Sequence, residues 1–180
     1  MSEQDPSLLE KEGLEYYRAG EYAKALDCFR QAQTSFASQG DARGVGEMWN
    51  DIGVVQYRQR QWTEAEEAFR RARQIAADAG NRGGEGKALG NLGSLYARQG
   101  KKAEAEASLT QAIAIFRELG DQEKLDDTLK ALSDLQLKRG RWVEALYHYE
   151  SKLESNAQPS PWQRFQLGAI RLLKGLLHLP

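Results

Sequence analysis

The sequence predicts an all-α protein, and three observations support this prediction. Val, Ile and Thr, which favour β-strands, number only four, five and four among 180 residues. Proline occurs only at Pro6, Pro159, Pro161 and Pro180, so the long stretch between the first two holds no residue that removes a backbone N–H from a helix. Glycine recurs there at intervals of twenty residues, as expected of turns that end successive helices.

These glycines divide the chain into segments of about twenty residues, two to each repeat of forty. They stand at Gly20, Gly40, Gly80, Gly100, Gly120 and Gly140, with Arg60 at the remaining internal position. Other side chains share the period of forty: Gly13, Gly53 and Gly93; Ala25, Ala65, Ala105 and Ala145; Phe29, Phe69, Leu109 and Tyr149. Self-similarity at a fixed period of this length predicts a solenoid built from helical hairpins.

The repeated residues resemble the tetratricopeptide repeat family, and the third copy matches its pattern best. The matching residues are Leu89, Leu92, Gly93, Tyr96, Gly100, Ala105, Leu109 and Ala112. The period of forty residues is similar to that of an extended subclass found in cell-polarity adaptors and kinesin light chains. The resemblance implies a right-handed solenoid of four helix-turn-helix hairpins in residues 6–157, at about 6–45, 46–85, 86–125 and 126–157.

Residues 158–180 follow the repeats as a proline-bounded segment, and they predict an amphipathic helix. Its apolar face carries Trp162, Phe165, Leu172 and Leu176. This segment has no acidic residue, and removing its three Lys and Arg residues from the total of 25 leaves 22 basic against 26 acidic residues upstream. We expect the apolar face to cap the open end of the fourth hairpin, as solenoids require. Contact with a membrane surface and self-association through this helix are the alternatives.

The resemblance also implies where a partner binds. In this family the first helix of each hairpin lines a concave groove that holds a peptide. Carried over position by position, the groove residues are Asn50, Tyr57, Arg58, Lys87, Asn91, Ser94, Arg98, Lys130 and Asp134. Asn91 stands in the Asn-Leu-Gly sequence with which the extended subclass commonly binds a peptide backbone. Asp51 and Ala131 at the equivalent positions do not continue a row of asparagines.

Basic residues recur near the ends of the predicted first helices, at Arg18, Arg58, Arg98 and Lys138. Their spacing of forty would align them in a column that binds acidic or phosphorylated segments through charge-assisted hydrogen bonds. The attraction of a cation to a helix C-terminus, about 0.3–1 kcal/mol, explains the same residues without any ligand. The sequence alone leaves both interpretations open.

Residue patterns typical of catalysis and of metal binding are missing from this sequence. Cys28 is the single cysteine, and His148 and His178 have no partner at metal-ligand spacing, so no disulfide, metal or cofactor is expected. The stretch from Gly83 to Lys87 departs from a phosphate-binding loop. With 25 basic and 26 acidic residues, the chain offers no excess of positive charge for nucleic acid. We expect a cytoplasmic protein without a signal peptide or a membrane span.

Together these observations predict a noncatalytic protein–protein interaction module or scaffold, not an enzyme. It would bind a peptide or helix of a partner protein in the concave groove, and the partner would carry acidic segments if the basic column takes part. One alternative is a peripheral membrane assembly factor that docks through its C-terminal helix. Another is a regulatory subunit of an enzyme system.

Overall fold

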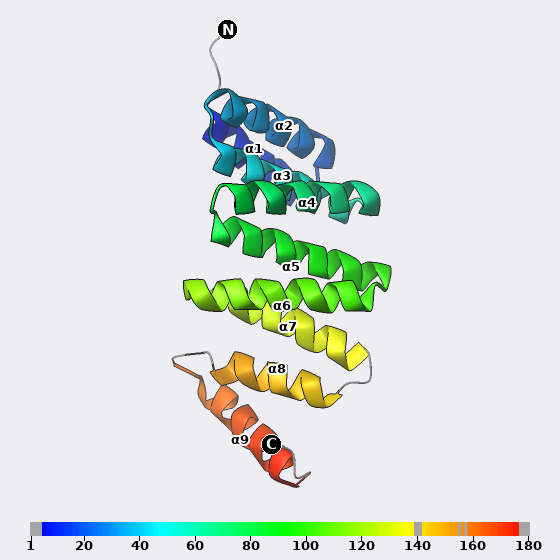
Figure 1. Ribbon diagram of the computed structural model, residues 1–180, viewed down its shortest axis with the longest axis vertical. Coiled ribbons are helices and arrows are strands. Elements are labelled where there is room, and N and C mark those ends of the chain that lie inside the picture. Colours follow the sequence, from blue (N-terminus) through cyan, green and yellow to red (C-terminus); the bar gives the residue numbers. More distant parts are fainter. Residues whose placement is uncertain (1–4, 139–141, 155, 157, 177–180) are drawn as a thin grey trace. The chain divides into compact units, whose positions relative to one another are not determined.

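The computed structural model describes residues 5–138, 142–154, 156 and 158–176. Within these residues it contains nine α-helices and no strand, which confirms the all-α prediction. The helices are α1 (Pro6–Arg18), α2 (Tyr22–Ser38), α3 (Ala42–Arg58), α4 (Trp62–Asp78), α5 (Arg82–Gln99), α6 (Lys102–Leu119), α7 (Gln122–Lys138), α8 (Trp142–Glu154) and α9 (Pro161–Leu176). The chain divides into two compact units, residues 1–115 and 116–180, and α6 spans the boundary (Figure 1).

In the first unit each helix packs against the next one along the chain. The helix α1 lies on α2, α2 on α3, α3 on α4 and α4 on α5 (Figure 1). The helix α3 also contacts α5, so the first helices of successive hairpins are neighbours. This arrangement is the repeat of two helices per forty residues that the spacing of the glycines predicts.

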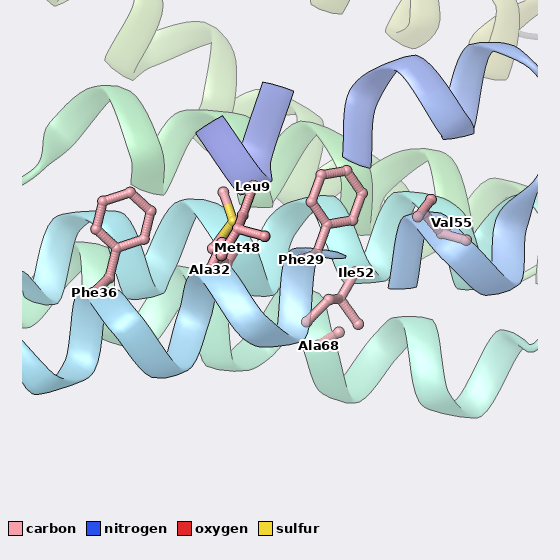
Figure 2. Close-up of a cluster of buried hydrophobic side chains, with 9 residues drawn as sticks. Leu9, Phe29, Ala32, Phe36, Met48, Ile52, Val55 and Ala68 are labelled. Carbon is pink, nitrogen blue, oxygen red and sulfur yellow. The ribbon is translucent and has the colours of Figure 1, made fainter. Parts of the chain in front are cut away.

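A continuous apolar core runs through the first two hairpins. Its buried residues come from four helices and are Leu9, Ala25, Phe29, Ala32, Phe36, Met48, Ile52, Val55 and Ala68 (Figure 2). Aromatic and half-buried side chains such as Tyr16 and Trp49 pack around it. Because neighbouring hairpins cover each other's apolar faces, stability comes from stacking and not from one hairpin alone.

Gly53 shows why a small residue recurs in the first helices. A Cβ atom at Gly53 would lie 2.6 Å from Cε1 of Phe69, and one at Gly93 would lie 2.6 Å from Cγ of Leu109. The two helices of a hairpin therefore approach too closely for a larger residue at these positions. The repeated glycine is a packing requirement of the fold.

The turns between helices use the left-handed backbone conformation that favours glycine. Gly20, Gly40, Gly80, Gly100 and Gly120 have φ between +65° and +78°. Arg60, at the one position of this series without glycine, adopts the same conformation with φ +62°. An L-residue in this conformation costs about 1 kcal/mol, so the turn is imposed here by the surrounding helices. Gly140 lies outside the described residues.

In the second unit α7 packs on α8, and α9 contacts α8. The predicted amphipathic C-terminal helix is therefore present, but the expectation that its apolar face covers the fourth hairpin is wrong. Trp162, Phe165, Leu172 and Leu176 are 64–69% exposed. The helix α9 instead contacts α8 through the side that carries the buried Ile170, and Lys174 Nζ on this side pairs with Glu150 at 2.9 Å.

Among the helices in the described residues, none is long and apolar enough to cross a membrane.

Candidate functional site

A pocket of about 220 Å³ opens between the first helices of the first unit. The helix α1 contributes Glu10 and Leu14, and α4 closes the back of the pocket with Ala72 and Ala76. The remaining lining residues come from α3 and from the start of α5, and they are Gly46, Glu47, Asn50, Asp51, Asn81, Gly84 and Lys87. Successive repeats thus each supply part of one polar pocket.

Two predicted groove residues meet beside this pocket. Asn91 Nδ2 on α5 donates a hydrogen bond to Asn50 Oδ1 on α3 at 2.8 Å. Both side chains are half-buried, and Lys87 lies one helical turn before Asn91. The bond joins two successive first helices and leaves the Asn91 carbonyl oxygen able to accept a hydrogen bond from a bound chain.

Acidic side chains dominate the electrostatics of the pocket. Burial, reinforced by the charge of Glu10, raises the pKa of Asp51 to about 7, against the opposing effects of Asn50 and Lys87. Burial and the nearby Glu47 also raise the pKa of Glu10. Three carboxyl groups therefore share the pocket with the ammonium group of Lys87, and one of them, Glu47, also pairs with Arg43 Nε at 3.1 Å. Such a site favours a cation or a hydrogen-bond donor as its ligand.

A ladder of tyrosine and arginine pairs runs along the ends of the first helices. Arg58 Nε donates to the Tyr17 hydroxyl at 2.9 Å, and Arg98 Nε donates to the Tyr57 hydroxyl at 3.2 Å. In both pairs the arginine follows the tyrosine by 41 residues, which is the period plus one. The predicted basic column is thus part of the contact between repeats. Arg58 and Arg98 are nevertheless exposed and retain guanidinium N–H groups for a ligand.

The remaining predicted groove residues lie elsewhere. Ser94 is half-buried and its hydroxyl donates to the Gly90 carbonyl of its own helix at 3.0 Å. Lys130 and Asp134 lie on α7, where they line a different pocket within the second unit. Arg18 is exposed at the end of α1, and the side chain of Lys138 lies outside the described part of the chain.

Four residues of this site were not among the predicted groove residues: Glu10, Glu47, Tyr17 and Asp51, which the sequence analysis noted only as a break in the row of asparagines. The period of forty carries a signal for all four of them. Glu10 precedes Asn50 by one period, Asp51 precedes Asn91, and Tyr17 precedes Tyr57. Extending each groove position to every repeat would have found them. Glu47 carries the same signal, because it precedes Lys87 by one period.

The described residues offer no arrangement of three His, Cys, Asp or Glu side chains that would hold a metal ion. The Cys28 thiol is buried between helices, and burial raises its pKa. A cysteine in such surroundings is a poor nucleophile, because the thiolate is disfavoured.

Helical hairpins that stack through repeated glycine contacts, with a polar pocket along their first helices, define an α-helical repeat protein. Residues 44–118 match the family model of the tetratricopeptide repeat, and this part of the chain belongs to that family. Such repeats are scaffolds for protein–protein interaction. The comparison with curated proteins finds no match.

Solved structures of the same fold include three proteins of different roles. BtubC (BKLC) from P. vanneervenii has 20% identity and a TM-score of 0.75, over 89% of this chain and 70% of that one. Aspartyl phosphate phosphatase F from Bacillus subtilis has 18% identity and a TM-score of 0.80. The match covers 95% of this chain but only 44% of the phosphatase. A putative kinesin light chain from Podosopora anserina with TPR-like repeats has 17% identity and a TM-score of 0.72. The match covers 96% of this chain and 90% of that one. At these identities the similarity establishes the fold alone.

Proposed function

We propose that the chain is a noncatalytic interaction module that binds a segment of a partner protein along α1, α3 and α5. The pocket between these helices is the observation that carries the proposal. It is open, it is lined by polar side chains from three successive repeats, and it lies beside the amide of Asn91. A backbone that passes over Asn91 could donate to its free carbonyl oxygen while one side chain enters the pocket.

The chemistry of the site specifies the partner further. Glu10, Glu47 and Asp51 favour a Lys or Arg side chain in the pocket. Acidic residues of the same partner would bind to the exposed Arg58 and Arg98 instead.

The distance between the pocket and Arg58 along α3 sets the spacing between the basic and the acidic residues of the partner. Arg58 follows Asn50 by eight residues on α3, which corresponds to about 12 Å along the helix axis. A partner that runs along the first helices would therefore separate its basic and acidic residues by about four positions if extended, and by about eight if helical. The proposal places this interaction in the cytoplasm, where the free thiol of Cys28 is stable.

Selection from a phage-displayed random peptide library on the immobilised full chain tests this function. We expect enriched peptides that combine Lys or Arg with Asp or Glu at one of these two spacings. The double variant Glu10→Gln/Glu47→Gln should weaken binding of a selected peptide about tenfold, because it removes two charges from the pocket.

The matched control is Glu64→Gln/Glu104→Gln, which removes the same charge from exposed positions on second helices and should leave the affinity unchanged. Enriched peptides without basic residues, or equal affinity for the wild-type chain and the pocket variant, would show that the pocket is not the binding site.

A further inference from the structure

The helix α9 presents an apolar surface to water. Trp162 and Phe165 stack with their ring centroids 5.3 Å apart, and Leu172, Leu173 and Leu176 continue the same face of the helix. Together these side chains expose roughly 600 Å² of apolar surface. This area is near the upper end of the size range for the largest apolar patch on a typical monomer. A surface of this size indicates a binding site.

The same unit contains an apolar groove. Its volume is about 590 Å³, and its lining residues are Lys130, Ser133, Asp134 and Leu137 from α7 and Ala145, Leu146, Tyr149 and Lys152 from α8. No described residue of α9 is part of the lining. Leu137 on the wall of the groove is 55% exposed.

Comparison with the first unit shows what this groove is built to hold. Eighty residues earlier, which is two periods, the equivalent surface of α4 includes Phe69 and Ala72, both buried, and that of α3 includes Asn50 and Tyr57, which bind Asn91 and Arg98 of α5. In the second unit the equivalents Tyr149 and Lys152 are only partly buried. The groove is the place where the first helix of a following hairpin would pack.

By its sequence position α9 is that following first helix. Its residues Phe165, Ala169, Leu172 and Leu176 come one period after Leu125, Leu129, Leu132 and Gln136, which are all buried in α7. The face that a first helix buries in the stack is thus the face that α9 leaves in water.

Contacts with α8 hold α9 of the same chain in this orientation. Lys174 Nζ lies 2.9 Å from Glu150, Arg171 Nη2 lies 2.8 Å from Glu154, and Gln166 Nε2 donates to the Tyr149 hydroxyl at 3.1 Å. The bonds of Lys174 and Arg171 come from the side of α9 away from its apolar face, and Gln166 lies at the edge of that face. A second helix is therefore needed to fill the groove while these bonds persist.

We propose that a second copy of this chain supplies the helix that fills the groove. The apolar face of α9 in each protomer packs into the α7/α8 groove of the other, and the two contacts are related by a twofold axis. Each protomer carries both the ridge, which is the apolar face of α9, and the α7/α8 groove. This is the self-complementarity that a twofold interface requires. Two contacts of this size bury more than about 1,200 Å², the range of stable protein interfaces. This inference concerns the second unit and does not rest on the peptide site.

A membrane surface fits these observations less well. Interfacial helices display their basic residues at the edges of the apolar face, where these residues meet anionic headgroups. Two of the three basic residues described in α9, Arg171 and Lys174, are instead paired with Glu150 and Glu154 of α8. The charge of the helix is thus largely neutralised within its own unit.

Light scattering of the full chain during size-exclusion chromatography tests the proposal. We expect a dimer at micromolar concentration. Leu172→Glu/Leu176→Glu on the ridge and Leu137→Glu in the groove should each raise the dissociation constant at least a hundredfold, because each change replaces an apolar contact by a charge that must lose its water. The matched controls Leu8→Glu and Leu8→Glu/Leu119→Glu place the same charges on exposed leucines elsewhere and should leave the dimer intact.

Mixing the ridge variant with the groove variant distinguishes the ridge-in-groove contact from other pairings. One of the two contacts then consists of wild-type surfaces, so a weaker heterodimer should form from two monomeric proteins. A Leu137→Glu protein that still forms a dimer would overturn the proposal, because the ridges would then pair with each other. A wild-type chain that stays monomeric at 100 micromolar would also overturn it, whether or not that chain floats with vesicles of phosphatidylcholine and phosphatidylserine.

Discussion

Arg98 on α5 donates a hydrogen bond to the hydroxyl of Tyr57 on α3 at 3.2 Å, and Arg58 makes the same contact with Tyr17 one repeat earlier. Each bond joins the C-terminal end of one first helix to that of the next. Both arginines are exposed, so the pairs set the register of the repeats while they remain accessible to a bound partner.

Because these pairs are in contact with solvent, we expect them to contribute little to stability. Tyr57→Phe should lower the free energy of unfolding by at most about 1 kcal/mol. A double-mutant cycle with Arg98→Gln, measured by urea unfolding, should give a coupling energy of about 0.2–1 kcal/mol. A coupling energy above 2 kcal/mol would mean that the ladder is a main structural element of the stack.

The raised pKa of Asp51 predicts a pH-dependent effect of Asp51→Asn. The folded chain holds a proton on Asp51 up to about pH 7, whereas an unfolded chain releases it near 3.8. The wild-type chain therefore loses stability as the pH rises from 4 to 8, and the amide variant lacks this loss. We expect Asp51→Asn to be more stable than wild type by about 1–3 kcal/mol at pH 8 and nearly equal to it at pH 4. Urea unfolding at the two pH values measures this, and an equal difference at both would contradict it.

Two glycines in first helices should respond in opposite ways to alanine. Gly53→Ala would place a methyl group 2.6 Å from the ring of Phe69, so we expect a loss of about 1–3 kcal/mol. Gly90→Ala would meet no atom within 4 Å and should gain about 0.5–1 kcal/mol from helix propensity. Thermal unfolding of both variants compares them directly. Equal effects would show that the hairpin is less tightly packed than the structure indicates.

Arg60 is the position where glycine should be an improvement. Its φ of +62° is the conformation of the glycines that end the other helices. Arg60→Gly should raise the free energy of unfolding by about 0.5–1 kcal/mol, because relief of the strained backbone exceeds the added entropy of the unfolded chain. Arg60→Ala is the control, since it removes the side chain without relieving the backbone and should bring no gain. A loss of stability in Arg60→Gly would mean that the arginine side chain contributes more than the backbone costs.

The fold was largely predictable because its constraints repeat. Gly53 and the glycines of the turns meet the same steric requirement in each copy, so the period of forty exposes them. Even the exception at Arg60 was visible as a gap in the series. The fold class and the family follow from such repeated positions alone.

The pocket was less predictable because its acidic character depends on packing. Asn50, Lys87 and Asn91 were found from their repeat positions, but the pKa of Asp51 depends on how closely α1, α3 and α5 enclose it. The orientation of α9 was not predictable from its own sequence. Its apolar pattern predicts a buried face, but α9 contacts α8 through the side that carries Ile170 and Lys174, where Glu150 and Glu154 of another helix supply ion-pair partners.

The central claim is that the pocket between α1, α3 and α5 binds a basic residue of a partner peptide. Titration of the isotope-labelled chain with a library-selected peptide, followed by amide chemical shifts, tests it most directly. The account predicts that the largest shifts occur at Asn50, Asp51, Lys87 and Asn91, and that Glu10→Gln/Glu47→Gln reduces them. Shifts confined to α7, α8 and α9, with none at the pocket, would contradict it.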